Sequence, residues 1–357
     1  MDELRTIEDV PLYQTSLRIM KFWSFLLQHN WRRYVCLIPY VMINATQFLD
    51  ICYSHESIDA IVRNAYIAVL FFNTILRAVL LCINRFDYEK FMDNIRLLYI
   101  ELTDAEDNVI RMLVRDTTTA AKNISKINLL MGVCSCVGFV IYPIFATSRV
   151  LPFGMYVPGI DKYESPFYEI FFALQIIITP MGCCMYIPFT NIIVAFILFA
   201  ILMCKVMQHK LKQLQNVNDE KARETINELT TYTYLVEFLA FGAMLCAMLF
   251  LLIIVETIGQ MIIIGIYIFM IFSQSVIMYY YANELYDQSL LVAEAAYDSD
   301  WFDFNVMTQK ILHLLILRAQ KPCAILIGKI YPMNLEMLQS LLNTTYSYFT
   351  LLKRLYG

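Results

Sequence analysis

The chain ends in an apolar segment that contains Asn343-Thr344-Thr345-Tyr346-Ser347-Tyr348-Phe349-Thr350-Leu351-Leu352, and the polar link Arg318-Ala319-Gln320-Lys321-Pro322 precedes it. The segment is mostly Leu, Met, Phe and Tyr, but it carries a stripe of polar side chains. At 100° per residue, the stripe falls within one arc of roughly 80° on a helix. Its members are Glu336, Gln339, Asn343, Ser347, Thr350 and Arg354.

A polar stripe on an apolar helix favours a surface in contact with water inside the membrane. Two ordinary explanations stay open: a polar seam against neighbouring helices, or a helix end that becomes wetter. The pore interpretation requires several subunits around an axis, because a single helix cannot enclose a channel. Leu351 and Leu355 are spaced i and i+4, so they could form an apolar constriction that gates by dewetting.

The composition indicates an all-α membrane protein with several spans. Of the 357 residues, 59% are hydrophobic and 16% are charged, and the mean hydropathy is +0.56. Seven stretches are long enough to cross a hydrocarbon core of about 20 helical residues. They are Tyr34–Tyr53, Asn64–Asn84, Ile127–Thr147, Phe167–Cys204, Tyr234–Ile258, Met261–Tyr281 and Asn334–Leu355. The fourth is predicted to be one long helix, kinked or broken near Pro180, Gly182 and Pro188.

The basic residues predict the orientation. With a cytoplasmic amino terminus, 21 of the 27 Lys and Arg residues lie on the inner side, as the positive-inside rule requires. The carboxyl terminus is then extracellular, which is opposite to a G-protein-coupled receptor. Arg77 lies within the second span, and we expect it to snorkel to the cytoplasmic interface.

The predicted organisation has four parts. Residues 1–33 form a cytoplasmic segment whose amphipathic helix, within Leu12–Asn30, lies on the inner membrane surface. Residues 34–281 hold transmembrane helices 1 to 6, with a ligand pocket in their outer half. Residues 282–333 form a cytoplasmic helical anchor that includes a separate helix over Val306–Gln320. Residues 334–357 hold the pore-lining seventh helix and a short extracellular end.

Catalytic and metal-binding patterns are absent from the sequence. It has no GxSxG, P-loop or HExxH motif, and its four histidines are scattered. Nine of the ten cysteines fall in or at the ends of apolar spans, which argues against a disulfide framework and a zinc site. We therefore expect no enzyme, no cofactor, no metal site and no nucleic-acid partner.

Aromatic residues and Met are concentrated in the outer halves of spans two, three, four and six. Such residues are usually core packing, but they would also form a pocket for a small apolar ligand. Gly138 would make room, and Tyr142 or Tyr267 would supply one directional contact. The full candidate set is Phe71, Phe72, Ser135, Gly138, Tyr142, Phe145, Ile177, Met181 and Tyr267.

The carboxyl-terminal third resembles the insect odorant receptor family. The matching residues begin at Tyr281-Ala282-Asn283-Glu284-Leu285 and include Ser289, Val292-Ala293, Tyr297, Trp301, Gln320-Lys321-Pro322, Gly328-Lys329 and Tyr346 to Leu352. The resemblance implies a ligand-gated, non-selective cation channel in the plasma membrane of olfactory sensory neurons. In it, odour-binding subunits and a shared co-receptor form a heterotetramer whose last helices line one central pore. The implied partners are the co-receptor, a small volatile organic ligand, membrane lipid and permeating cations.

The resemblance also implies roles for individual residues. Leu351 and Leu355 occupy the family's gate positions, and Ser135, Gly138 and Tyr142 keep the spacing of its third-span pocket wall. The pore stripe then includes Gln339, Asn343, Ser347 and Thr350. The co-receptor carries a long insertion in its second cytoplasmic loop that this chain lacks, so a tuning subunit is expected. Lys353 and Arg354 near the outer mouth disfavour a homomeric cation pore, which points to obligate partnership.

Three other classes compete with this interpretation. A gustatory receptor of the same superfamily would take a non-volatile ligand, but it would lack the Tyr-Ser-Tyr-Phe-Thr ending. A G-protein-coupled receptor would have an extracellular amino terminus. A secondary transporter is disfavoured because the sequence has no internal repeat and few ionisable residues within its spans.

Overall fold

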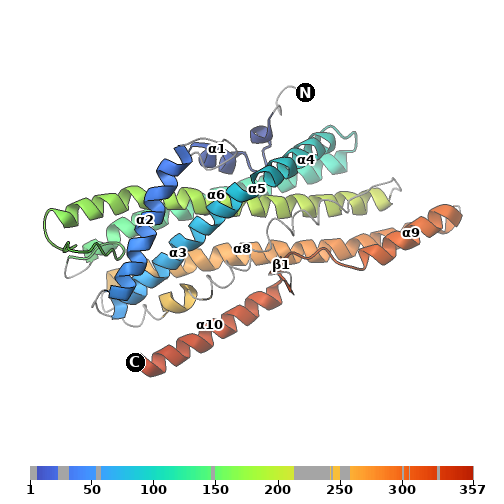
Figure 1. The fold of residues 1–357 in the computed structure, drawn as a ribbon. Helices are drawn as coiled ribbons and strands as arrows, with labels where there is room; N and C mark the ends of the chain where they lie inside the picture. Colours follow the sequence, from blue (N-terminus) through green and yellow to red (C-terminus); the bar gives the residue numbers. More distant parts are fainter. Residues whose placement is uncertain are drawn as a thin grey trace.

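The computed structural model in Figure 1 describes residues 6–22, 32–53, 58–145, 149–212, 242, 244–249, 258–299, 301–304, 306–327 and 330–356. The described chain is almost entirely helical. Its α-helices are α1 Gln14–Phe22, α2 Arg32–Tyr53, α3 Ile58–Ile83, α4 Arg85–Thr103, α5 Asn108–Ile141, α6 Phe167–Lys212, α8 Ile258–Tyr297, α9 Val306–Ala319 and α10 Leu335–Tyr356. Short 3-10 helices cover Ile7–Asp9, Tyr142–Phe145 and Trp301–Asp303, and strands β1 Leu326–Ile327 and β2 Tyr331–Pro332 form an antiparallel pair.

Four helices within the described residues are long and apolar enough to cross a membrane. These stretches are Ala60–Ile83, Asn108–Ile141, Phe167–Leu211 and Met261–Tyr297. Helices α2 and α10 match two further predicted spans in position but are less apolar. The predicted fifth span, Tyr234–Ile258, is described only at residues 242, 244–249 and 258. The structure thus agrees with a multi-pass helical protein, while the number of spans and their orientation stay predictions.

Helix α6 is the central element of the bundle. It is one unbroken helix of 46 residues with Pro180 and Pro188 inside it, which confirms the prediction that this long apolar stretch does not reverse. Its most apolar part is 83% buried because α5 and α8 pack along it and α1 and α3 also contact it. This surrounding packing compensates for the hydrogen bonds that two prolines remove from a helix.

Two helices continue beyond the predicted spans. Helix α5 runs without a break from Asn108 into the third span, as expected for an extension of that span. Helix α8 continues to Tyr297, so the predicted boundary between residues 281 and 282 falls inside one helix. The reason is that Ala282, Leu285 and Val292 are buried and keep the helix packed past that point.

Helix α1 confirms an amphipathic helix near the amino terminus but not its predicted position on a membrane surface. Leu17 and Met20 are buried. The ring of Tyr13 lies 6.1 Å from the ring of Phe196 in α6, and its hydroxyl donates to the Met92 carbonyl in α4 at 3.3 Å. The apolar face of α1 therefore packs against protein, with α6 as its main partner.

Arg77 does not snorkel to the cytoplasmic interface, so that expectation was wrong. Its side chain is 2% exposed and donates to the Thr190 hydroxyl of α6 at 2.8 Å. Its guanidinium carbon lies 4.2 Å from the centroid of the Tyr186 ring. A polar acceptor and an aromatic face on α6 together stabilise the guanidinium inside the protein.

The link between α9 and α10 contains the β1–β2 pair, which the sequence did not predict. This link is held by Ser289 and Asn283, two residues of the carboxyl-terminal stretch that resembles a known family. Ser289 in α8 accepts a hydrogen bond from the Cys323 amide at 2.8 Å, and Asn283 in α8 accepts one from the Leu335 amide at 3.5 Å. Asn334 then caps α10, since its side-chain oxygen accepts from the Met337 amide at 2.9 Å.

Candidate functional site

Most of the predicted pocket residues belong to one buried cluster between α2, α3, α5, α6 and α8. Phe71, Tyr142, Met181 and Tyr267 are all buried within it, and Ser135 of α5 is buried as well. Side chains from four predicted spans therefore contribute to one hydrophobic core.

Tyr267 of α8 lies close against α5. The Tyr267 hydroxyl donates to the Ser135 carbonyl at 3.3 Å, and its ring stacks on Phe139 with centroids 5.0 Å apart. A Cβ atom at Gly138 would lie 2.8 Å from the Tyr267 hydroxyl oxygen. The absence of a side chain at Gly138 thus allows the tyrosine to approach α5 this closely.

An aromatic stack joins α2, α3 and the loop before α6. The Tyr40 and Phe71 rings are parallel with centroids 4.4 Å apart, and Phe153 from the loop lies 5.2 Å from Phe71. Both the amide and the carbonyl of Phe153 bond to the Gln175 side chain, at 3.3 and 2.9 Å. Satisfying both backbone groups lets this loop insert an aromatic side chain into the bundle.

A buried ion pair holds the same loop against α2 and α3. Lys162 donates to Asp50 at 2.7 Å, and the Asp50 side chain is 2% exposed. Asn64 donates to the other Asp50 oxygen at 2.9 Å. Gly154 presses against Asp50 and Asn64 so closely that a Cβ atom would clash with both side chains. The loop is therefore held by charge at Lys162 and by aromatic packing at Phe153.

Tyr142 has a polar partner within the protein that the sequence did not predict. Arg63 of α3 donates to the Tyr142 hydroxyl at 3.2 Å, and its guanidinium carbon also lies 5.3 Å from the centroid of that ring. An arginine that both bonds and stacks fixes the orientation of a tyrosine. The hydroxyl keeps its own hydrogen for a second partner.

Three candidate residues are not part of the described cluster. Phe72 is 49% exposed and Ile177 is 69% exposed. Each lies 100° around its helix from a buried neighbour, Phe71 or Ile178, so it faces away from the cluster. Phe145 ends the 3-10 helix Tyr142–Phe145, and its side chain lies outside the described residues.

Sequence reasoning missed Tyr40, Phe139, Phe153 and Arg63, which complete the cluster. A signal was present for Phe153, because Leu151, Phe153 and Met155 alternate with Pro152 and Gly154 in the loop before α6. All three are buried. An alternating apolar pattern in a loop indicates a segment with one side buried.

The polar stripe on α10 faces away from the rest of the protomer. Leu338, Leu341 and Thr345 are buried on the opposite side, toward α8 and Gly242. The stripe residues Glu336, Gln339, Asn343, Ser347 and Arg354 are exposed, and Thr350 is half-buried. Leu351 is 54% exposed, whereas the side chain of Leu355 lies outside the described residues. Figure 1 shows α10 at the edge of the bundle.

The hydroxyl groups on this stripe present oxygen lone pairs outward. Ser347 donates to the Asn343 carbonyl at 2.9 Å, and Thr350 donates to the Tyr346 carbonyl at 2.9 Å. Their donors are used within the helix, so the remaining capacity of these oxygens is as acceptors. Water molecules or cations are the natural partners of such a surface.

Comparison with known proteins gives one consistent family. A family model described as 7tm Odorant receptor matches residues 57–230 and 223–346. The chain is 55% identical to odorant receptor 30a of Drosophila melanogaster, over 99% of this chain and 100% of that protein. It is 40% identical to odorant receptor 10 of Aedes albopictus, over 99% and 100%. It is 38% identical to odorant receptor Or2 of Anopheles gambiae, over 98% and 100%.

The fold is also similar to a solved structure. The insect olfactory receptor OR5 from Machilis hrabei, in complex with eugenol, superposes with a TM-score of 0.83. The superposition covers 98% of this chain and 100% of that one, at 16% sequence identity. At this identity the likeness concerns the arrangement of the helices, and it extends over the whole chain.

Proposed function

Since this chain belongs to the insect odorant receptor family, as a tuning receptor and not the shared co-receptor, we propose that it is an odorant-gated subunit of a non-selective cation channel. It forms a heterotetramer with the co-receptor in the plasma membrane of olfactory sensory neurons. Its amino terminus is cytoplasmic and its carboxyl terminus is extracellular. The observation that carries the channel proposal is the polar stripe of α10, which is exposed in the protomer along an otherwise apolar helix.

The buried cluster around Tyr267 is the proposed odorant site. Its walls come from Phe71, Ser135, Gly138, Tyr142 and Met181. OR5, which shares the fold, binds eugenol, and this supports a site for a small organic ligand. Burying roughly 250 Å² of ligand surface yields about 6 kcal/mol before the costs of association. Affinity is then modest, and one added methylene changes it by only about 0.8 kcal/mol.

In the proposed mechanism, α10 lines the pore and the odorant changes the population of its open state. Gln339, Asn343, Ser347 and Thr350 contact water and permeating cations. Leu351 and Leu355 close the outer end when no ligand is bound. The ligand needs only a higher affinity for the state in which these leucines are withdrawn from the axis.

Cysteine accessibility on α10 tests the pore assignment. The receptor is expressed with its co-receptor, activated by an odorant, and treated from outside with a charged methanethiosulfonate. Asn343→Cys and Ser347→Cys are expected to be modified, with a reduced current. Thr345→Cys is the matched control, because Thr345 is buried on the opposite side of the same helix. Equal modification at all three positions would contradict a pore lined by the stripe.

Recording currents with and without the co-receptor, against a panel of volatiles, tests the proposed function. Odorant-evoked cation current that needs both chains is the expected result. Responses to non-volatile compounds alone would favour a gustatory-type channel. A tag on the amino terminus that antibodies reach in unpermeabilised cells would favour a G-protein-coupled receptor and overturn the orientation.

A further inference from the structure

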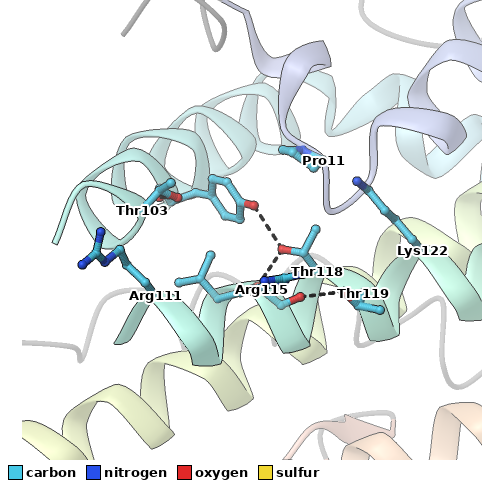
Figure 2. A pocket seen from close by; sticks show the side chains of 9 residues that line it. Pro11, Thr103, Arg111, Arg115, Thr118, Thr119 and Lys122 are labelled. Carbon is cyan, nitrogen blue, oxygen red and sulfur yellow. Dashed lines mark hydrogen bonds between the residues drawn. The ribbon is translucent and has the colours of Figure 1, made fainter. Parts of the chain in front are cut away.

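A pocket lies between α4, the first half of α5 and the segment before α1 (Figure 2), whereas Ser135 and Gly138 of the proposed odorant site lie in the second half of α5. Its volume is about 430 Å³, and it is lined by Pro11, Tyr99, Thr103, Arg111, Val114, Arg115, Thr118, Thr119 and Lys122. Tyr99 and Thr118 are hydrogen-bonded to each other at 3.0 Å. Burial raises the pKa of the Tyr99 phenol, so this pair stays neutral and forms a rigid floor.

The pocket lining is basic. Arg111, Arg115 and Lys122 follow one face of α5 at spacings of four and seven residues, and no acidic residue is among the residues that line the pocket. Within the described part of the chain, neither Arg115 nor Lys122 has a carboxylate partner. Both side chains are exposed, so their charges are available to a ligand.

Arg111 is held in place at one end of the pocket. Its guanidinium donates to the Asn108 side-chain oxygen at 2.6 Å and to the Glu106 carbonyl at 3.4 Å. In Figure 2, Lys122 stands at the opposite end and extends toward Pro11, with Thr118 between them. Cations at both ends and a neutral floor between them suit a ligand that carries more than one negative group.

The spacing of the cations selects the class of anion. With a rise of 1.5 Å per residue, Arg111 and Arg115 are about 6 Å apart along α5, and Arg115 and Lys122 are about 10 Å apart. One phosphate group cannot contact both ends of such a row. A molecule with two or three separated phosphates can, because each guanidinium binds one phosphate in a bidentate manner and the ammonium binds another.

We propose that the pocket between α4 and α5 binds a polyphosphate anion through Arg111, Arg115 and Lys122. The hydroxyls of Thr118 and Thr119 donate to backbone carbonyls at 2.8 Å, so the three cations carry the recognition. Two sources share this chemistry: a phosphoinositide head group and a soluble inositol phosphate. The lipid source rests on the proposed orientation, in which Lys122 lies five residues before the third span and hence near the inner leaflet.

The test uses full-length purified receptor and measures the melting temperature and Kd. In detergent, the probe is inositol 1,4,5-trisphosphate. In nanodiscs, the probe is phosphatidylinositol 4,5-bisphosphate in phosphatidylcholine, compared with phosphatidylserine at equal total charge. The variant is Arg115→Gln/Lys122→Gln. The matched control is Lys90→Gln/Lys126→Gln, which removes two exposed charges from the same helices outside the pocket.

At least one probe is expected to raise the melting temperature, with a Kd at least tenfold weaker in the pocket variant and changed less than threefold in the control. Binding of the soluble probe supports a soluble source, and binding only in nanodiscs supports a lipid source. Three results would overturn the site: no binding of either probe, equal loss in the two variants, or equal binding of phosphatidylserine. Each variant must keep the wild-type melting temperature without ligand, as expected for exposed side chains.

Discussion

Gly138 controls how closely Tyr267 lies against α5. In Gly138→Ala, the new methyl group would be 2.8 Å from the Tyr267 hydroxyl oxygen and 3.2 Å from Cζ, so the ring must rotate away from the Ser135 carbonyl. We expect the half-maximal odorant concentration to change by about tenfold, equivalent to ~1.4 kcal/mol, with a changed order of preferred ligands. Overpacking of this kind costs about 1–3 kcal/mol of stability. Currents measured with the co-receptor and thermal unfolding together test this.

Gly265→Ala is the matched control for that substitution. Gly265 lies on α8, like Tyr267, but a Cβ atom there has no atom within 4 Å. Alanine also favours a helix over glycine by about 1 kcal/mol. Odorant responses should therefore be unchanged and the melting temperature equal or slightly higher. If both glycine variants respond like the wild type, the Tyr267 contact does not shape the odorant site.

Lys162 and Asp50 form the ion pair that attaches the loop before α6. In Lys162→Met, the carboxylate of Asp50 remains buried without its cation. Removing one partner of a buried pair costs about 3–5 kcal/mol, so the melting temperature should fall clearly. The double variant Asp50→Asn/Lys162→Met should recover much of the loss, because it leaves no buried charge. Equal unfolding temperatures for Lys162→Met and the double variant would show that the pair contributes little.

For individual residues, the sequence indicates the type of side chain at a position better than the direction in which that side chain points. Tyr142 and Tyr267 are both buried in the main hydrophobic core, and Gly138 lies against Tyr267. Phe72 is exposed, because neighbouring residues on a helix face different directions and the inward face of α3 depends on where α2 and α6 pack. Arg77 was misjudged for a related reason: its acceptor Thr190 is 113 residues away along the chain, so sequence periodicity gives no sign of it.

At the scale of elements, Asp107 links the start of α5 to the end of α6. It accepts from the Val109 amide at 2.8 Å and contacts the His209 ring at 2.6 Å. The hydrogen bond with His209, followed by that with Val109, holds the pKa of Asp107 below its usual value of 3.8. A lowered carboxyl pKa gives stability that is fully present above the unfolded-state value and is lost as pH falls through the folded-state value.

Asp107→Asn tests this link, because asparagine also caps helices but does not titrate. The wild type should melt at a higher temperature than the variant at neutral pH. The difference should shrink as pH falls below about 4, when the carboxylate is protonated. Thermal unfolding from about pH 7 to pH 3 measures it. A difference that stays constant over this range would mean that Asp107 acts only as a helix cap.

Leu351 on α10 is the described member of the proposed gate. It is 54% exposed in the protomer, at the outer end of the polar stripe. Leu351→Ala removes apolar surface from the constriction, which admits water more easily. We expect a several-fold increase in current without odorant. Tyr348→Ala is the control, since Tyr348 is also exposed but lies about one helical turn before the proposed constriction; a leak of equal size there would argue against a specific gate.

Long apolar helices were the most predictable elements. α3, α5, α6 and α8 each contain a long apolar stretch that the sequence marks as a span, and α9 was predicted nearly to the residue at Val306–Ala319. The β1–β2 pair was not, because strands of two residues carry almost no sequence pattern. Helix α8 runs past the predicted end of the sixth span to Tyr297, where buried residues such as Leu285 and Val292 keep it packed.

For the whole molecule, sequence predicts which surfaces are buried within one chain but only indirectly those between chains. The side chains around Tyr267 are buried within one protomer. Their aromatic character already indicated that they would be. Helix α10 is different, because its stripe and the apolar Tyr346, Tyr348 and Leu351 are all exposed in one copy. Lipid can cover an apolar surface in a membrane protein, but it cannot serve a row of polar side chains, so the stripe and not the apolar surface is the reason to propose further chains around α10.

The charges of Lys353 and Arg354 bear on how many copies of this chain the proposed tetramer contains. Both side chains are exposed near the carboxyl end of α10, so four identical copies would place a dense ring of positive charge at the proposed outer mouth. Such a ring repels entering cations. A mixed tetramer carries fewer copies of these charges.

Lys353→Gln/Arg354→Gln should therefore increase inward cation current with the co-receptor, most strongly at low ionic strength, where charges are least screened. Arg149→Gln, in the loop beside Tyr168, is the control that should leave the current unchanged. A double variant with wild-type single-channel current at low salt would place these charges away from the ion path.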